Sequence, residues 1–510
     1  MMWLSGRRLV AGLLVGGMLL TGCTSTGGGS SDKATDAQQD GAQGGAEPAP
    51  PPDQQRKQEY RKGDEHAPVP PDLRSTFALD VDTASYEYAR RTIREGRMPP
   101  PSTVRPEEFV NSFRQGYQRP AGDGFSVSAD GARVGAGEWS LLRVGLATQR
   151  EPAEAAERRK PAALTFVIDV SGSMSEPGRL DLVKHALRRT VDELRSEDSV
   201  ALVTFSGDSR TVLPMTGLGD EGQRADIRST IEGLEPADST NLAAGVRTGY
   251  AESVAGKREG ATNRVVLLSD ALANTGETSA DSILEQVREY RATHGITLFG
   301  VGVGSDYGDA LMERLTNQGD GHTSYVSSRR EAEEVFVRQL PRNIRLRARD
   351  AKAQVTFDPD NVAEQRLVGY DNRRIADQDF RDDAVDGGET GPGHTVTALY
   401  AVRLAEGADG HVATATVRWQ DPDSREPYEK SRHVDVEVLD DALWESADPR
   451  LRTVAAAAYF AEALRGAERD LRGAPALGEL AEHVRDAASE TDDPQVVRLA
   501  RTIDRADALD

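Results

Sequence analysis

Oxygen-bearing side chains gather directly after an apolar run at residues 163–169. The segment reads ALTFVIDVSGSM, so Asp169, Ser171 and Ser173 occupy alternate positions in a short Ser/Gly turn. An apolar run of this length predicts a buried central strand. One carboxylate and two hydroxyls, with no Cys or His in the cluster, are ligands that suit a hard divalent cation such as Mg²⁺.

Two further oxygen donors stand where such a site could use them. Thr240 lies in the sequence DSTN, immediately before a segment with helical character. Asp270 follows a second apolar run, RVVLLS, at residues 264–269. The sequence therefore offers five candidate metal ligands, which are Asp169, Ser171, Ser173, Thr240 and Asp270.

The segments between residues 160 and 340 alternate between predicted strands and predicted helices. Strands are predicted at 163–169, 199–205, 210–214, 264–269, 296–303 and 323–326. Helices are predicted at 178–195, 222–233, 241–254, 281–294, 308–317 and 330–343. This alternation predicts an α/β fold, a doubly wound and mostly parallel sheet of Rossmann-like form. Ligands bind such sheets beyond the carboxyl ends of the strands, where Asp169 and Asp270 are expected to lie.

These residues carry a family resemblance. The pattern Asp169-x-Ser171-x-Ser173, with Thr240 and Asp270, resembles the metal-ion-dependent adhesion site (MIDAS) of von Willebrand factor type A (VWA) domains. Residues 79–113 and 367–400 resemble the flanking regions of bacterial VWA lipoproteins of the YfbK-like type.

The resemblance implies a function for each candidate ligand. Ser171 and Ser173 would bind Mg²⁺ (or Mn²⁺ or Ca²⁺) directly, and the other three would bind it directly or through water. One position of the ion would stay open for an Asp or Glu carboxylate of a protein partner. The chain departs from the pattern at Ala271, where many VWA domains have Gly.

The N-terminus predicts export and lipid anchoring. Arg7 and Arg8 precede an apolar stretch at residues 9–20, which is typical of a signal peptide covering residues 1–22. The following Leu-Thr-Gly-Cys resembles a bacterial lipobox, which implies lipid attachment at Cys23. We therefore expect a membrane-anchored lipoprotein of the cell envelope, exposed outside the cytoplasm. The alternatives are an ordinary signal peptide with a chance cysteine, or a short membrane anchor.

Composition divides the rest of the chain. Residues 23–71 are rich in Gly, Ser, Gln and Pro, which predicts a disordered tether. An N-terminal flank (72–159), the VWA-like domain (160–344), a β-rich flank (345–445) and a C-terminal helical region (446–510) are expected to follow. We expect strands of the two flanks to pair with each other, so that the VWA-like domain is an insertion in one β unit.

Charge and motifs limit the other possible functions. The formal net charge is −22, which argues against binding to the phosphate backbone of nucleic acids. Asp80 and Asp82 in LDVDTAS leave open a metal-dependent phosphohydrolase, although Asp82 or Thr83 is expected to cap the helix that follows. No Ser/His/Asp set is evident, so we predict a binding protein rather than an enzyme. A structural protein with a vestigial metal site is the remaining alternative.

Overall fold

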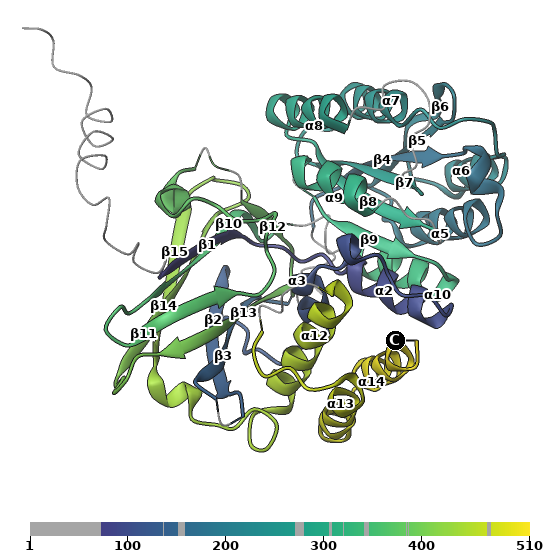
Figure 1. Cartoon of the computed structure of the whole chain (residues 1–510). Helices are drawn as coiled ribbons and strands as arrows, with labels where there is room; N and C mark the ends of the chain where they lie inside the picture. Colours follow the sequence, from purple (N-terminus) through teal and green to yellow (C-terminus); the bar gives the residue numbers. More distant parts are fainter. Residues whose placement is uncertain are drawn as a thin grey trace, which may run out of the picture. The chain divides into compact units, whose positions relative to one another are not determined.

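Figure 1 shows the computed structural model of the chain, which describes residues 73–135, 137–150, 159–270, 280–304, 309–319, 321–340, 346–383, 385, 387–466 and 471–509. The predicted signal peptide (1–22), Cys23 and the predicted tether (23–71) lie outside the described residues. Ala271 also lies outside them. What the sequence indicated for these residues therefore remains a prediction.

The centre of the α/β domain is a six-stranded sheet with the order β6-β5-β4-β7-β8-β9. All neighbouring strands are parallel except β5 and β6, which are antiparallel. This arrangement confirms the predicted doubly wound, mostly parallel sheet. The strands are β4 (Ala162–Asp169), β5 (Ser199–Phe205), β6 (Ser209–Gly217), β7 (Thr262–Ser269), β8 (Thr297–Val303) and β9 (Thr323–Val326).

Helices cover both faces of this sheet (Figure 1). Alternate strand side chains point to opposite faces, so Phe166 packs with one group of helices and Val167 with the other. The Phe166 face is covered by α5 (Leu180–Glu193), α6 (Glu221–Glu232), α10 (Arg329–Glu333) and η3 (Glu334–Gln339). The Val167 face is covered by α7 (Leu242–Ala255), α8 (Ala280–His294) and α9 (Asp309–Gln318).

One predicted helix differs from the structure. The prediction at 330–343 was a single α-helix, but α10 ends at Glu333 and a π-helical segment, η3, continues to Gln339. Residues 341–345 lie outside the described part. A hydrophobic pattern locates a helix but does not distinguish α from π hydrogen bonding, since both bury one apolar stripe.

The β unit consists of two antiparallel sheets. The five-stranded sheet contains β1 (Arg74–Ala78), β10 (Ala348–Phe357), β12 (Gly388–Thr390), β14 (His411–Gln420) and β15 (Pro427–Asp435). The four-stranded sheet contains β2 (Phe125–Arg133), β3 (Trp139–Thr148), β11 (Val362–Leu367) and β13 (Thr395–Leu404). Their inner faces share one apolar core, to which Val144 and Val355 belong.

Strands from before and after the α/β domain pair within both sheets. Phe77 of β1 lies opposite Ala353 of β10, and Val144 of β3 lies opposite Ala398 of β13. The predicted pairing of the two flanks is therefore observed. The β unit can close only after both flanks have been made, because each sheet takes strands from both sides of the α/β domain.

The remaining helices share a separate core. It combines α2 (Ala84–Arg94) and α3 (Pro106–Asn111) with the C-terminal helices α12 (Pro449–Arg465), α13 (Leu477–Thr491) and α14 (Pro494–Asp507). Phe460 of α12 meets Phe109 of α3 with ring centroids 6.0 Å apart. No helix in the described part combines the length and apolarity needed to span a bilayer.

Candidate metal centre

The candidate centre lies at the carboxyl edge of the central sheet. Asp169 is the last residue of β4, and Asp270 follows the last residue of the neighbouring parallel strand β7. From β4 the chain continues to β5 on one side, and from β7 it continues to β8 on the other. Strand order therefore reverses between these two aspartates, where open α/β sheets bind their ligands.

Both oxygens of Asp169 accept hydrogen bonds. The backbone N–H of Ser171 donates to Oδ1 at 2.8 Å, and the hydroxyl of Ser269 donates to Oδ2 at 2.6 Å. Burial raises the pKa of Asp169 to about 6, although these bonds oppose the rise, and the negative charge of Asp270 adds to it. The two carboxylates follow neighbouring parallel strands and so lie at the same edge of the sheet.

A short 3₁₀ turn brings the two serine hydroxyls together. Ser171 precedes η2 (Gly172–Ser175), and its Oγ lies 3.1 Å from Oγ of Ser173. Ser171 is buried and Ser173 is half-buried. Such a turn suits the loop because its Gly and Ser residues tolerate tight backbone geometry. Two of the predicted ligands are therefore adjacent, as the sequence pattern suggested.

Thr240 is buried on a loop that hydrogen bonds tie to the same edge of the sheet. The backbone N–H of Ala237 donates to Val170 O, and that of Asn241 donates to Ser206 O, both at 2.6 Å. Val170 follows β4 and Ser206 follows β5. The hydroxyl-bearing residue is thus held at the edge where Asp169 and Asp270 lie.

Asp270 is fully buried beside Arg179, a residue that no sequence pattern singled out. Arg179 Nη1 donates to Asp270 Oδ2 at 2.8 Å, and the Arg179 side chain is only 3% exposed. The other oxygen, Oδ1, is buried and has no hydrogen-bond partner among the described residues. A buried carboxylate oxygen without a partner is costly, and a bound cation would remove that cost.

The residues present fit a hard divalent cation. The donors are two carboxylates and three hydroxyls, all oxygen, with one carboxylate oxygen still to be satisfied. Within the described ranges, no three His, Cys, Asp or Glu side chains form a metal-binding group. With only two carboxylates, this set would need oxygens from water or from a partner to complete a six-coordinate shell.

Asp80 and Asp82 are buried anchors between segments. Arg373 Nε donates to Asp80 Oδ2 at 3.0 Å, and the backbone N–H of Thr323 donates to Asp82 Oδ1 at 2.9 Å. Thr83 stands at the N-cap of α2, one of the two predicted positions, but its side chain makes no capping hydrogen bond. Carboxylates committed to these contacts are poorly placed to attack a phosphate, because a nucleophile must reach its substrate.

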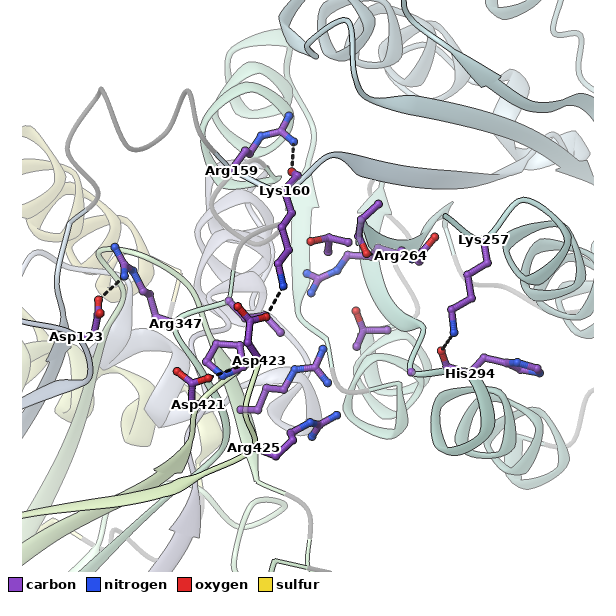
Figure 2. Close-up of a pocket in the computed structure, with 18 residues that line it drawn as sticks. Asp123, Arg159, Lys160, Lys257, Arg264, His294, Arg347, Asp421, Asp423 and Arg425 are labelled. Carbon is purple, nitrogen blue, oxygen red and sulfur yellow. Dashed lines mark hydrogen bonds and ion pairs between the residues drawn. The ribbon is translucent and has the colours of Figure 1, made fainter. Parts of the chain in front are cut away.

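A polar pocket of about 600 Å³ lies at the opposite end of the central sheet (Figure 2). Thr262 and Thr297, which begin β7 and β8, belong to its lining. Two of its basic side chains pair with acidic side chains of the lining, Lys160 with Asp423 and Arg347 with Asp123. The α/β domain and the β unit both contribute to the lining, and we assign no ligand to the pocket.

Family models match most of the chain. The model for the von Willebrand factor type A domain matches residues 163–338, which contain all five candidate ligands. The model described as "Uncharacterized protein YfbK, C-terminal" matches 344–411, and one described as "von Willebrand factor" matches 54–140. The α/β domain with its Asp-x-Ser-x-Ser loop is thus a VWA domain.

Individual relatives extend this result beyond the domain. The chain is 33% identical over 420 residues to YfbK of Escherichia coli (strain K12), which covers 77% of this chain and 71% of YfbK. The chain therefore belongs to the YfbK family of VWA-domain proteins.

Two further similarities have lower sequence identity. Inter-alpha-trypsin inhibitor heavy chain H2 of Sus scrofa is 28% identical over 166 residues, and the match covers 32% of this chain but only 18% of the heavy chain. A solved structure, von Willebrand factor type A from Catenulispora acidiphila, aligns with a TM-score of 0.45 at 15% identity, covering 77% of this chain and 88% of the other.

Proposed function

We propose that this protein is a cell-envelope lipoprotein whose VWA domain binds a protein partner through a divalent cation. Asp169, Ser171, Ser173, Thr240 and Asp270 would hold the cation. The observation that supports this most directly is Asp270 Oδ1, a buried carboxylate oxygen that has no hydrogen-bond partner among the described residues. Asp270 follows β7, and the hydroxyl oxygens of Ser171 and Ser173 lie 3.1 Å apart at the same edge of the sheet.

Each residue would have a separate task in this site. Ser171 and Ser173 would supply neutral oxygens, and the two aspartates would supply the charge that attracts the ion. The hydrogen bonds to Asp169 fix the orientation of its carboxylate before any ion arrives. Bound there, the cation would supply a positive charge with an incomplete shell, and an Asp or Glu side chain of a partner could complete that shell.

The cellular setting is part of the same proposal. Cys23 would carry the lipid, and residues 23–71 would act as a tether that lets the folded part move away from the membrane surface. We place the protein in the cell envelope, outside the cytoplasm.

The first test is ion binding by the full chain in detergent micelles. Titration calorimetry with Mg²⁺ and Mn²⁺ should show one site, and saturating ion should raise the melting temperature. Asp270→Ala should abolish the binding heat. A matched control is Asp281→Asn, which changes an exposed carboxylate on α8. Absence of any binding heat in the wild-type chain would support a vestigial site instead.

The second test addresses the partner. Immobilised full chain should retain a protein from envelope extract in Mg²⁺, and a chelator should release it. Asp270→Ala should retain none, whereas Asp281→Asn should behave as wild type. Equal retention with and without the chelator would contradict a cation-mediated contact.

A further inference from the structure

Arg179 is a buried arginine that connects the parts of the candidate centre. Its Nη1 donates to Asp270 Oδ2 at 2.8 Å and to the backbone oxygen of Ser173 at 3.1 Å. Its Nη2 lies 2.8 Å from Glu176 Oε2. One guanidinium thus joins the loop after β4, which carries the serines, to the loop after β7, which carries Asp270.

The end of β8 also accommodates this arginine. Gly304 has a φ of +93°, and a Cβ there would lie 2.7 Å from Arg179 Nε. The backbone therefore passes close to the arginine, in a conformation that favours glycine. Since burying an arginine costs free energy unless its donors are satisfied, these contacts together hold Arg179 in one position.

This position leaves Asp270 only one free oxygen. Oδ2 accepts from Arg179, while Oδ1 has no hydrogen-bond partner among the described residues. At Asp169 both oxygens already accept hydrogen bonds. A cation that also bound Asp270 Oδ2 would lie beside the positive guanidinium of Arg179, and this repulsion favours ligation through Oδ1 alone.

One-oxygen ligation favours small cations. Mg²⁺ requires near-octahedral geometry with bonds of about 2.0–2.1 Å, whereas Ca²⁺ accepts six to eight oxygens at about 2.3–2.6 Å and often binds carboxylates through both oxygens. Adjacent ligands of an octahedron lie about 3.0 Å apart for bonds of about 2.1 Å, and about 3.4 Å apart for bonds of about 2.4 Å. The Ser171 and Ser173 hydroxyl oxygens are 3.1 Å apart, close to the smaller value.

We propose that Arg179 is a positioning residue that restricts Asp270 to one-oxygen ligation and thereby makes the centre prefer Mg²⁺ or Mn²⁺ over Ca²⁺. This inference rests on the proposed function, because it concerns the same ion. It adds Arg179, which lies outside the predicted ligand set. It also adds a measurable consequence, which is the ratio of the Ca²⁺ affinity to the Mg²⁺ affinity.

The test compares Mg²⁺ and Ca²⁺ affinities by calorimetry in the full chain and its Arg179→Met and Arg179→Lys variants. Both ions carry the same charge, so loss of the arginine's charge should change the two affinities alike and cancel in their ratio. Freeing Asp270 Oδ2 should favour only Ca²⁺. We expect Arg179→Met to shift the ratio toward Ca²⁺ on the order of tenfold, the effect typical of lost outer-shell partners.

Arg179→Lys and a surface control complete the design. Lysine can still donate to Asp270 Oδ2, so Arg179→Lys should shift the affinity ratio in the same direction as Arg179→Met but by less. The Arg179→Lys variant also provides a readout if Arg179→Met does not fold. Arg188→Met is the control, because Arg188 lies on the same helix, α5, in a largely exposed pair with Glu232. It should leave the ratio unchanged.

The outcomes separate the two proposals. If the wild-type chain binds ions but both Arg179 variants keep its Ca²⁺/Mg²⁺ ratio, the inference fails and the proposed function stands. If the wild-type chain binds neither ion, the proposed function fails and the inference falls with it. A wild-type chain that prefers Ca²⁺ would also overturn the inference.

Discussion

The guanidinium of Arg264 on β7 lies 3.2 Å from the Glu389 carboxylate on β12, and both side chains are almost fully buried. This pair joins the central sheet of the VWA domain to the five-stranded sheet of the β unit. Arg349 on β10 approaches the second oxygen of Glu389 at 3.7 Å. Glu389 thus lies between two positive charges that would be costly to bury without it.

Replacing Glu389 with Gln should therefore destabilise the fold strongly. The variant would leave two guanidinium groups beside a neutral amide, and losing one partner of a buried ion pair costs about 3–5 kcal/mol. Urea unfolding of the full chain measures the change. Asp281→Asn serves as the control, because it breaks an exposed pair with Arg314, for which a loss below about 1 kcal/mol is expected. Equal losses in both variants would contradict a special contribution from Glu389.

The strand pattern made the fold predictable from the sequence. Buried parallel strands need apolar side chains on both faces, so the runs at 163–169 and 264–269 stand out as continuous apolar segments. Their carboxyl ends indicated Asp169 and Asp270 as neighbours. The serine pair followed from its spacing, since residues two apart in a tight turn can direct their hydroxyls to one place.

Arg179 and Glu389 could not be found in this way. Arg179 bonds to a carboxylate 91 positions away, and Arg264 pairs with Glu389 125 positions away. A single charged residue at the start of a helix or on a strand normally indicates a solvent-exposed position. Only the packing of several segments decides that these charges are buried. Ser269 offered a weak signal, as a hydroxyl that ends an apolar strand just before Asp270.

Glu107 should make stability depend on pH in the neutral range. Its burial raises the pKa to about 7 from 4.5, with a contribution from Asp80, although backbone N–H groups of Glu107 and Tyr370 oppose the rise. Between these pH values the folded state binds more protons than the unfolded state, so stability decreases as pH rises. Glu107→Gln removes this titration. Its free energy of unfolding should exceed that of wild type by up to about 3 kcal/mol at pH 8 and by little at pH 4.5.

Urea midpoints of both chains at pH 5, 6, 7 and 8 test the prediction for Glu107. Glu445→Gln is the control, because the side chain of Glu445 is exposed. A constant offset between Glu107→Gln and wild type across this range would show that the carboxyl group does not titrate in it.

His322 should make stability decrease as pH falls, which is opposite to the pH dependence expected from Glu107. Burial lowers the pKa of His322 well below 6.5, and repulsion from a protonated His394 and from the charges of Arg264 and Arg373 acts in the same direction, so the folded state keeps His322 neutral. Below about pH 6.5 the unfolded chain binds a proton that the folded chain does not, and stability is lost at about 1.4 kcal/mol per pH unit. His322→Gln should reduce the loss between pH 6.5 and 5.5 by about 1 kcal/mol.

The measurement for His322 is the same denaturation series below pH 7. His433→Gln, which changes an exposed histidine on β15, is the control. An unchanged slope in His322→Gln would mean that other groups cause the acid sensitivity.

Thr240 offers a test of the candidate ligand set that separates coordination from folding. Thr240→Ala removes both the hydroxyl and a buried methyl group, whereas Thr240→Ser removes only the methyl. If the hydroxyl helps to hold the ion, directly or through water, Thr240→Ala should weaken Mg²⁺ binding by about tenfold or more, and Thr240→Ser should stay near wild type. In the ion-free state, the melting temperature of Thr240→Ser reports the loss of the methyl group alone, about 1 kcal/mol, and any further decrease in Thr240→Ala reports what the hydroxyl contributes to the fold. Equal Mg²⁺ affinity in the two variants would remove Thr240 from the ligand set, and unfolding of Thr240→Ala alone would assign its hydroxyl to the fold instead.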